Sequence, residues 1–167
     1  MNTTLISRRQ FGAGLALAGT ATAFGFKAQK RLRLGVDNFA VRAMGWKADK
    51  LVDYAAKLQC DSLFITDLYA FKNFNAPYLK DVKQHADDKG IKIYVGSWSI
   101  CPTSTRFKDE WGTADEHLAL GIKISKALGS PAFRVILGTR ADRPTPGGID
   151  ARINDTVKVL KRGKTRA

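Results

Sequence analysis

The sequence predicts an α/β fold built from about four repeated strand–helix units. Four short runs rich in β-branched and aromatic residues alternate with longer segments of helical period, the pattern that marks parallel βαβ units. The runs are LRLGV at 32–36, SLFIT at 62–66, IKIYV at 91–95 and FRVIL at 133–137. Apolar residues occupy both the odd and the even positions of these runs, which is typical of strands in sheets that are covered on both faces.

The first three helices have recognisable stripes or ends. Residues 47–59 carry an apolar stripe at helical spacing, and residues 77–89 form a second amphipathic segment that stops at Gly90. The third helix opens with TADE at 113–116, a capping box in which the Thr and Glu side chains satisfy each other's backbone amides. It ends at Gly129, a residue suited to the left-handed conformation of a helix cap.

The fourth helical segment is short in the sequence pattern. It places Ile153, Val157 and Leu160 on one stripe, which we expect to face the core. The sequence after Leu160, KRGKTRA at 161–167, has no apolar rhythm and contains mainly charged residues. We therefore expect the helix to stop near Leu160 and the basic tail 161–167 to be foreign to the domain, as out-of-frame translation would produce.

The strongly basic charge is concentrated at the ends of the chain. The formal net charge is +13, but residues 34–157 contain 17 basic and 15 acidic residues, a net charge of only +2. A nucleic-acid surface needs basic groups gathered on one folded face, often with aromatic side chains between them. Because the body of the chain mixes both signs along its helices, we expect no nucleic-acid partner.

Residues 1–28 have the organisation of an export signal. A short basic region precedes a modest apolar run and a small-x-small site, Ala21-Thr22-Ala23. Ser7, Arg8, Arg9 and Phe11 resemble the twin-arginine signal, which exports folded proteins. We therefore expect the twin-arginine translocase as a partner and a periplasmic or other extracytoplasmic location in a bacterium.

The strand ends favour a (β/α)₈ barrel over a doubly wound nucleotide fold. Neither the turn after the first predicted strand nor residues 138–148 contain the glycine pattern of a dinucleotide or phosphate loop. Instead, polar or aromatic side chains follow each strand, as at the active rim of a barrel. The candidate ligand-binding residues on this rim are Asp37, Asp67, Trp98 and Arg140. Such a set suits a polyhydroxy ligand, although each of them alone is equally consistent with an ordinary loop residue.

Three longer stretches resemble a known family. They are LRLGVDNFAVRAMGW with KLVDYAAKLQCDSLFITD, then KGIKIYVGSWSICP, and ALGSPAFRVILGTRADR. These stretches resemble the sugar phosphate isomerase/epimerase family of xylose isomerase-like TIM barrels. The resemblance covers residues 32–160 and implies a partial (β/α)₈ TIM barrel, about four βα units of eight, that takes a sugar or sugar phosphate-like small molecule.

The resemblance also implies which catalytic parts to expect. Full-length relatives hold a divalent metal (Mn, Mg or Zn) with carboxylate and histidine ligands on strands five to eight, and use it to isomerise or epimerise sugars. We expect this chain alone to bind no metal and to contain no catalytic residue. It is then either a truncated isomerase or epimerase, or a non-catalytic remnant that at most binds a sugar.

Two further expectations concern surfaces. His85 and His117 fall on predicted helices outside the barrel, so both are expected at the surface. An open half-barrel leaves an apolar inner face and two unpaired strand edges, so we expect the chain to self-associate through them.

Overall fold

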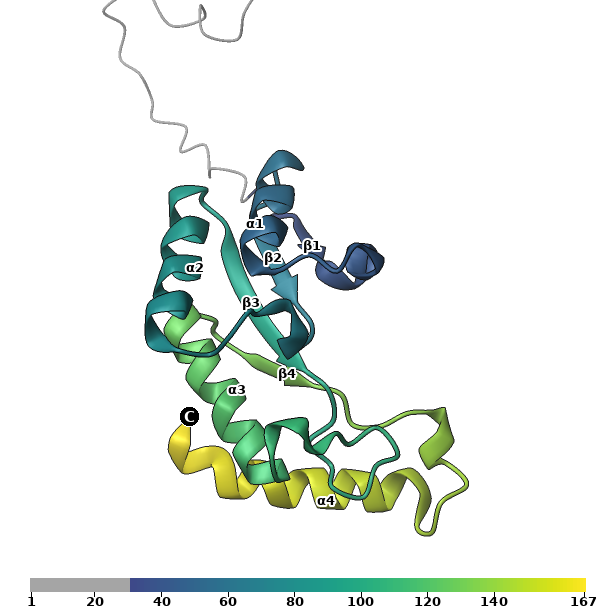
Figure 1. Cartoon of the computed structure of the whole chain (residues 1–167). Coiled ribbons are helices and arrows are strands. Elements are labelled where there is room, and N and C mark those ends of the chain that lie inside the picture. Colours follow the sequence, from purple (N-terminus) through teal and green to yellow (C-terminus); the bar gives the residue numbers. More distant parts are fainter. Residues whose placement is uncertain (1–30) are drawn as a thin grey trace, which may run out of the picture. The chain divides into compact units, whose positions relative to one another are not determined.

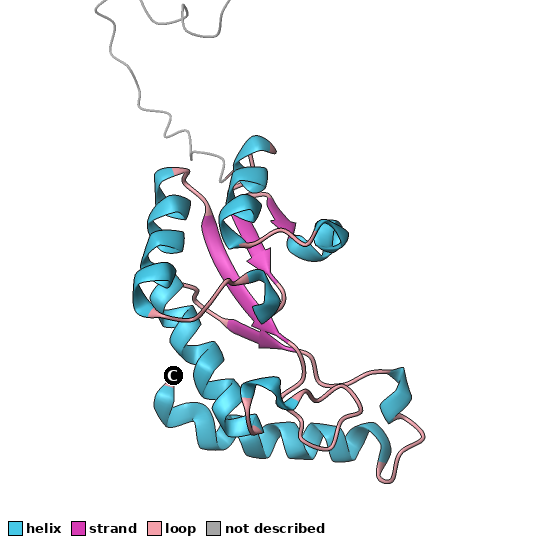
Figure 2. Cartoon of the chain, in the orientation of Figure 1, coloured by secondary structure: helices cyan, strands magenta, loops and turns pink. Residues whose placement is uncertain are grey.

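The computed structural model describes residues 31–167, so the predicted signal residues Ser7, Arg8, Arg9 and Phe11 lie outside the described residues. The α/β prediction is confirmed, with strands and helices in strict alternation (Figure 1, Figure 2). The strands are β1 (Gly35–Asp37), β2 (Ser62–Ile65), β3 (Lys92–Ser97) and β4 (Phe133–Val135). The helices are α1 (Ala48–Lys57), α2 (Ala76–Asp88), α3 (Ala114–Leu128) and α4 (Gly148–Gly163).

The four strands form one parallel sheet in the order β1-β2-β3-β4. Each strand therefore pairs with the next one along the chain, and the order does not reverse within residues 31–167. A doubly wound sheet reverses its strand order and carries helices on both faces. Here α1, α2 and α3 contribute to one core against a single face of the sheet. The arrangement is a singly wound run of βα units.

The helix ends follow the predicted signals. The Asn75 side chain accepts a hydrogen bond from the Tyr78 amide and caps α2. Thr113 and Glu116 form the expected capping box at the start of α3, with both reciprocal bonds present. Gly129 ends α3 with φ of 64°, a left-handed conformation that costs glycine nothing. Local side-chain chemistry thus fixes where these helices begin and end.

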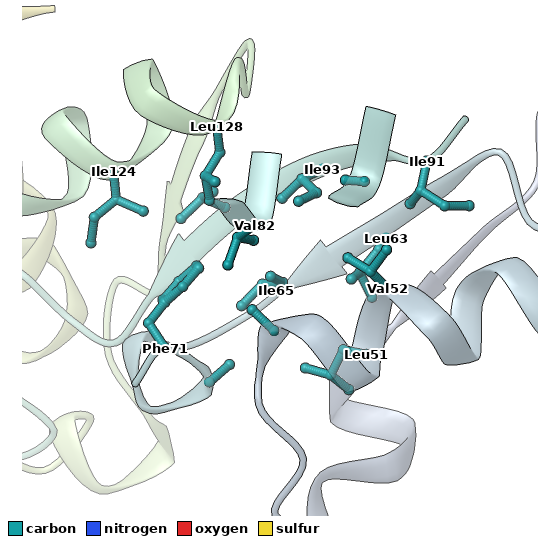
Figure 3. Close-up of a cluster of buried hydrophobic side chains, with 14 of the residues drawn as sticks. Leu51, Val52, Leu63, Ile65, Phe71, Val82, Ile91, Ile93, Ile124 and Leu128 are labelled. Atoms are coloured by element: carbon teal, nitrogen blue, oxygen red, sulfur yellow. The ribbon is translucent and has the colours of Figure 1, made fainter. Parts of the chain in front are cut away.

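The main core lies between the sheet and the first three helices (Figure 3). Leu63 and Ile65 of β2 and Ile93 of β3 are almost fully buried and project toward the helices. Leu51 of α1 and Ile124 of α3 meet them from the other side. Each such side chain removed from water contributes roughly 1.5–3 kcal/mol, so this layer supplies most of the apolar stabilisation.

The opposite face of the sheet is not covered by any helix described between residues 31 and 167. The register places Phe64 beside Tyr94, and Gly96 beside Arg134, on this face. Tyr94 is 38% exposed and Phe64 is half-buried. The strands are therefore buried on one face only, although their composition suits a sheet covered on both.

The fourth helix corrects two expectations. It does not stop near Leu160 but continues to Gly163. Its buried residues are Arg152, Thr156, Val159 and Gly163, whereas the predicted stripe is exposed on the other side. The sequence periodicity identified the apolar stripe of α4 correctly, but it could not tell which side of the helix packs against the rest of the domain. The contact with α3 decides it, because Leu118 lies where a Cβ on Gly163 would stand, 2.3 Å from its Cδ2 atom.

The expectation that both histidines lie at the surface is wrong for His117. His85 is half-buried on α2, but the His117 side chain is fully buried on the inward side of α3. Its Nε2 atom lies 2.6 Å from the Ser97 hydroxyl at the end of β3, and its ring packs against Trp111 at 4.8 Å between centroids.

At 16 residues α4 is the longest of the helices, and no helix within residues 31–167 is long and apolar enough to cross a membrane.

Candidate functional site

The carboxyl ends of the strands carry the longer connections of the sheet. Short 3₁₀ turns follow three of the four strands, at Asn38–Met44, Leu68–Ala70 and Arg140–Asp142, and a longer connection follows β3. In sheets of parallel βα units this edge is where ligands bind, because loops there present side chains from several strands to one place. The edge therefore defines the candidate site.

A cavity of about 210 Å³ opens at this edge. Asp67 follows β2 and Trp98 follows β3, and the structure brings both into its lining, as the sequence predicts for a shared rim. The full lining is Phe39, Arg42, Thr66, Asp67, Ser97, Trp98, Arg134 and Ile136. Its walls combine aromatic faces, one carboxylate and two guanidinium groups.

One oxygen of the Asp67 carboxylate holds the turn after β2, and the other is available to a ligand. Its Oδ1 atom accepts a hydrogen bond from the Tyr69 amide at 3.0 Å and caps the turn after β2. Within residues 31–167 no group donates to its Oδ2 atom. The side chain is thus held in one orientation by the turn, with one oxygen left to accept a ligand hydroxyl.

Trp98 supplies an aromatic face and a hydrogen-bond donor. Its indole Nε1 is buried and has no hydrogen-bond partner within residues 31–167. The Lys108 ammonium lies 5.0 Å from the centre of its ring and 4.7 Å from that of Tyr69. Lys108 also donates to the Tyr69 hydroxyl at 2.7 Å, and that hydroxyl in turn contacts Glu110. This network ties the β3–α3 connection to the turn after β2.

The other two predicted rim residues do not join this cavity. Asp37 lies at the end of β1, where its Oδ1 accepts a hydrogen bond from the Phe39 amide at 2.7 Å and caps the next turn. Arg140 lines a separate hollow with Gly138, Thr139, Arg143 and Ile149. Of the four predicted residues, the structure therefore brings together Asp67 and Trp98 and separates Asp37 and Arg140 from them.

Sequence reasoning missed the two arginines of the cavity. Arg134 is the only charged residue in the run FRVIL, and strict alternation places it on the opposite face from Phe133 and Val135. That period-two signal was sufficient to find it. Arg42 lies in the 3₁₀ turn after β1, at a position that neither helical nor strand periodicity predicts. Only the folded chain brings it beside Asp67.

A buried carboxylate holds two of the rim loops together. Asp142 is fully buried and accepts hydrogen bonds from the Thr105 amide at 2.7 Å, the Thr139 amide at 2.6 Å and the Ser104 hydroxyl at 3.0 Å. The two backbone amides stabilise the charged form and lower the pKa of Asp142 to about 2. The carboxylate is therefore ionised near neutral pH, and it joins the β3–α3 connection to the turn after β4.

The residues of the cavity do not fit a divalent metal. The described part of the chain contains no group of three His, Cys, Asp or Glu side chains able to hold a metal ion. The cavity itself offers one carboxylate, already engaged by a backbone amide, next to two guanidinium groups. Hard cations need several oxygen ligands, whereas guanidinium groups attract anions. The donor set of this site suits an anion instead.

Comparisons of the chain with protein families, with curated proteins and with solved structures find no match.

Proposed function

We propose that residues 32–160 are the first four βα units of a xylose isomerase-like TIM barrel and that their carboxyl edge binds a sugar or sugar phosphate. Two features support the barrel: the sequential parallel order of the strands, and the helices packed on a single face. The observation that carries the binding function is the cavity in which Asp67 and Trp98 meet. The proposal includes export through the twin-arginine translocase to the periplasm.

The cavity matches the chemistry of a sugar in two respects. The Trp98 ring offers an apolar face on which the C–H face of a sugar ring can stack. The Asp67 Oδ2 atom provides an acceptor for a hydroxyl group. Isomerisation or epimerisation itself is not assigned to residues 32–160, because the metal ligands of the resembled family lie on later strands.

The binding function is tested by replacing the aromatic face. Trp98→Leu should weaken binding of a neutral sugar such as xylose by about tenfold or more, because the half-buried aromatic ring that lines the site is lost. The binding constant is measured by isothermal titration calorimetry on the full chain. Trp46→Leu is the matched control, because Trp46 lines the adjoining cavity beside α1, which shares Arg42 and Asp67 with this one but not Trp98, and it should change the constant far less. Equal losses in the two variants, or no sugar binding by the unaltered chain, would contradict the proposal.

We also propose that the open edges of the sheet mediate self-association. Leu32 and Leu34, before β1, are 80% and 61% exposed. On α4 at the other edge, Ile149, Ile153, Val157 and Leu160 form an exposed apolar stripe. In a closed barrel each helix packs against the strand that comes after it, so the stripe of one copy would cover the β1 edge of the next.

Self-association of this kind should increase with salt. Both edges carry basic residues, Arg33 at one end and Lys158, Lys161 and Lys164 at the other, so added salt screens their repulsion. Sedimentation velocity of the full chain should show dimers or larger species. The double variant Ile153→Glu/Val157→Glu should shift them to monomers, whereas Asn154→Glu, an exposed position on the same helix, should not. A monomer at all concentrations and salt levels would refute the contact.

A further inference from the structure

We propose that the cavity binds an oxyanion group of its sugar ligand, phosphate or carboxylate, between the guanidinium groups of Arg42 and Arg134. The inference rests on the proposed sugar site, whose cavity it shares. It goes further because it assigns the charge of the ligand and two residues that bind it. Both arginines line the cavity, one from the turn after β1 and the other from β4.

A glycine on β3 allows the Phe64 ring to lie close to the strand beside Arg134. Gly96 is the partner of Arg134 in the parallel register, and a Cβ there would stand 3.1 Å from the Arg134 carbonyl oxygen and 3.2 Å from two ring carbons of Phe64. Because Gly96 has no side chain, the Phe64 ring of β2 lies over β3 at this point. The guanidinium carbon of Arg134 lies 5.1 Å from the centre of the Phe64 ring. The arginine is thus supported on the open face of the sheet.

Arg42 is supported in a comparable way. Its guanidinium carbon lies 4.3 Å from the centre of the Phe39 ring, which also lines the cavity. An arginine that lies over an aromatic ring still presents its N–H groups outward in its own plane. Two such groups at one cavity give several hydrogen-bond donors for a ligand.

Neither arginine has its charge compensated within residues 31–167. No carboxylate in this part of the chain forms an ion pair with Arg42 or Arg134, and Asp67, in the same cavity, pairs with neither. Two like charges at a largely apolar cavity repel each other, so an oxyanion between them relieves that repulsion. Guanidinium forks match the paired oxygens of carboxylate and phosphate, and such charge-assisted bonds are among the strong ones.

The inference is tested by binding of charged and neutral sugars to the full chain. Glucose 6-phosphate, gluconate and glucose are titrated by calorimetry, together with inorganic phosphate. Arg134→Gln should weaken binding of the anionic ligands about 10- to 100-fold, as expected for the loss of one charge-assisted donor pair, and should weaken binding of glucose much less. Arg134→Lys keeps the charge but loses the fork, so it should give a smaller loss. Arg140→Gln, in the separate hollow, is the matched control and should bind as the unaltered chain does.

The outcomes separate this inference from the proposed sugar site. Anionic sugars that bind no tighter than glucose, or an equal loss in Arg140→Gln, would overturn the anion site. Binding of inorganic phosphate that depends on Arg134, without any binding of glucose, would support the anion site and refute the sugar site. The tighter of glucose 6-phosphate and gluconate identifies the oxyanion. Because Arg134→Lys retains a long basic side chain on β4, the test remains decisive even if Arg134→Gln fails to fold.

Discussion

Lowering the pH from 7 to 4.5 is expected to destabilise the folded chain by about 2 kcal/mol through His117 alone. Burial lowers the pKa of this side chain from about 6.5 to about 4, with a smaller opposing effect from Glu110. A complete shift of this size corresponds to ~3 kcal/mol, and about 2 kcal/mol of it is lost by pH 4.5. Between pH 4, near the pKa of His117 in the folded chain, and pH 6.5, near its pKa in the unfolded chain, the unfolded chain binds up to one more proton than the folded chain does. Stability therefore rises with pH, is complete above about 6.5, and is lost as the pH falls toward 4.

The measurement is urea unfolding at pH 7 and pH 4.5. His117→Gln should be less stable at pH 7, because it loses the ring contact with Trp111 and alters the bond to Ser97. Its stability should nevertheless fall less on acidification than that of the unaltered chain. The chain contains only two histidines, so His85→Gln is the natural control. An unchanged pH dependence in His117→Gln would show that another group is responsible.

Replacing Asp142 is expected to lower the melting temperature on the order of 5–10 °C and to loosen the rim loops. Asp142→Ala leaves two backbone amides and one hydroxyl without their acceptor in a buried place, and such groups are costly to leave unpaired. Asp142→Asn should cost nearly as much, because its NH₂ group must face at least one of the backbone amide donors. A carboxylate is the only group of this shape that accepts from all three.

Thermal unfolding of the two Asp142 variants provides the test, with Asp155→Asn as control. Asp155 on α4 also makes two polar contacts, to the Thr103 hydroxyl and the Lys158 ammonium. The hydroxyl can reverse its donor role, so this substitution should be mild. The lowered pKa of Asp142 means that its contribution is complete above about pH 4 and is lost as the pH falls through about 2. If the loss of stability in Asp142→Asn varied strongly between pH 4 and pH 7, this assignment would be contradicted, because Asp142 stays ionised throughout that range.

The two residues act in different pH ranges and on different parts of the rim. His117 couples α3 to the end of β3 through Ser97. Asp142 joins the loops that come after β3 and β4. Together they fix the positions from which the cavity is built, so weaker sugar binding is the expected secondary effect of either substitution. That secondary effect should disappear when binding is corrected for the fraction of folded protein.

The sequence alone determined the elements of this fold and many of their boundaries. Alternating strand and helix patterns, the capping box at Thr113 and the stop at Gly129 are local signals, because each depends on residues within a turn or two of one another. The same applies to Asp67 and Trp98, which had to reach a common edge if the strands were parallel and consecutive. The residues immediately after a strand are therefore a reliable guide to that edge.

Tertiary structure decided the remainder, since packing depends on contacts between residues that lie far apart in sequence. It buried His117 beside Ser97 and Trp111, and it chose which stripe of α4 meets α3. It also excluded Arg140 from the cavity and admitted Arg134, whose guanidinium lies near the Phe64 ring of β2. Periodicity gives the direction of a side chain relative to its own element, and only the neighbouring elements determine what that side chain meets.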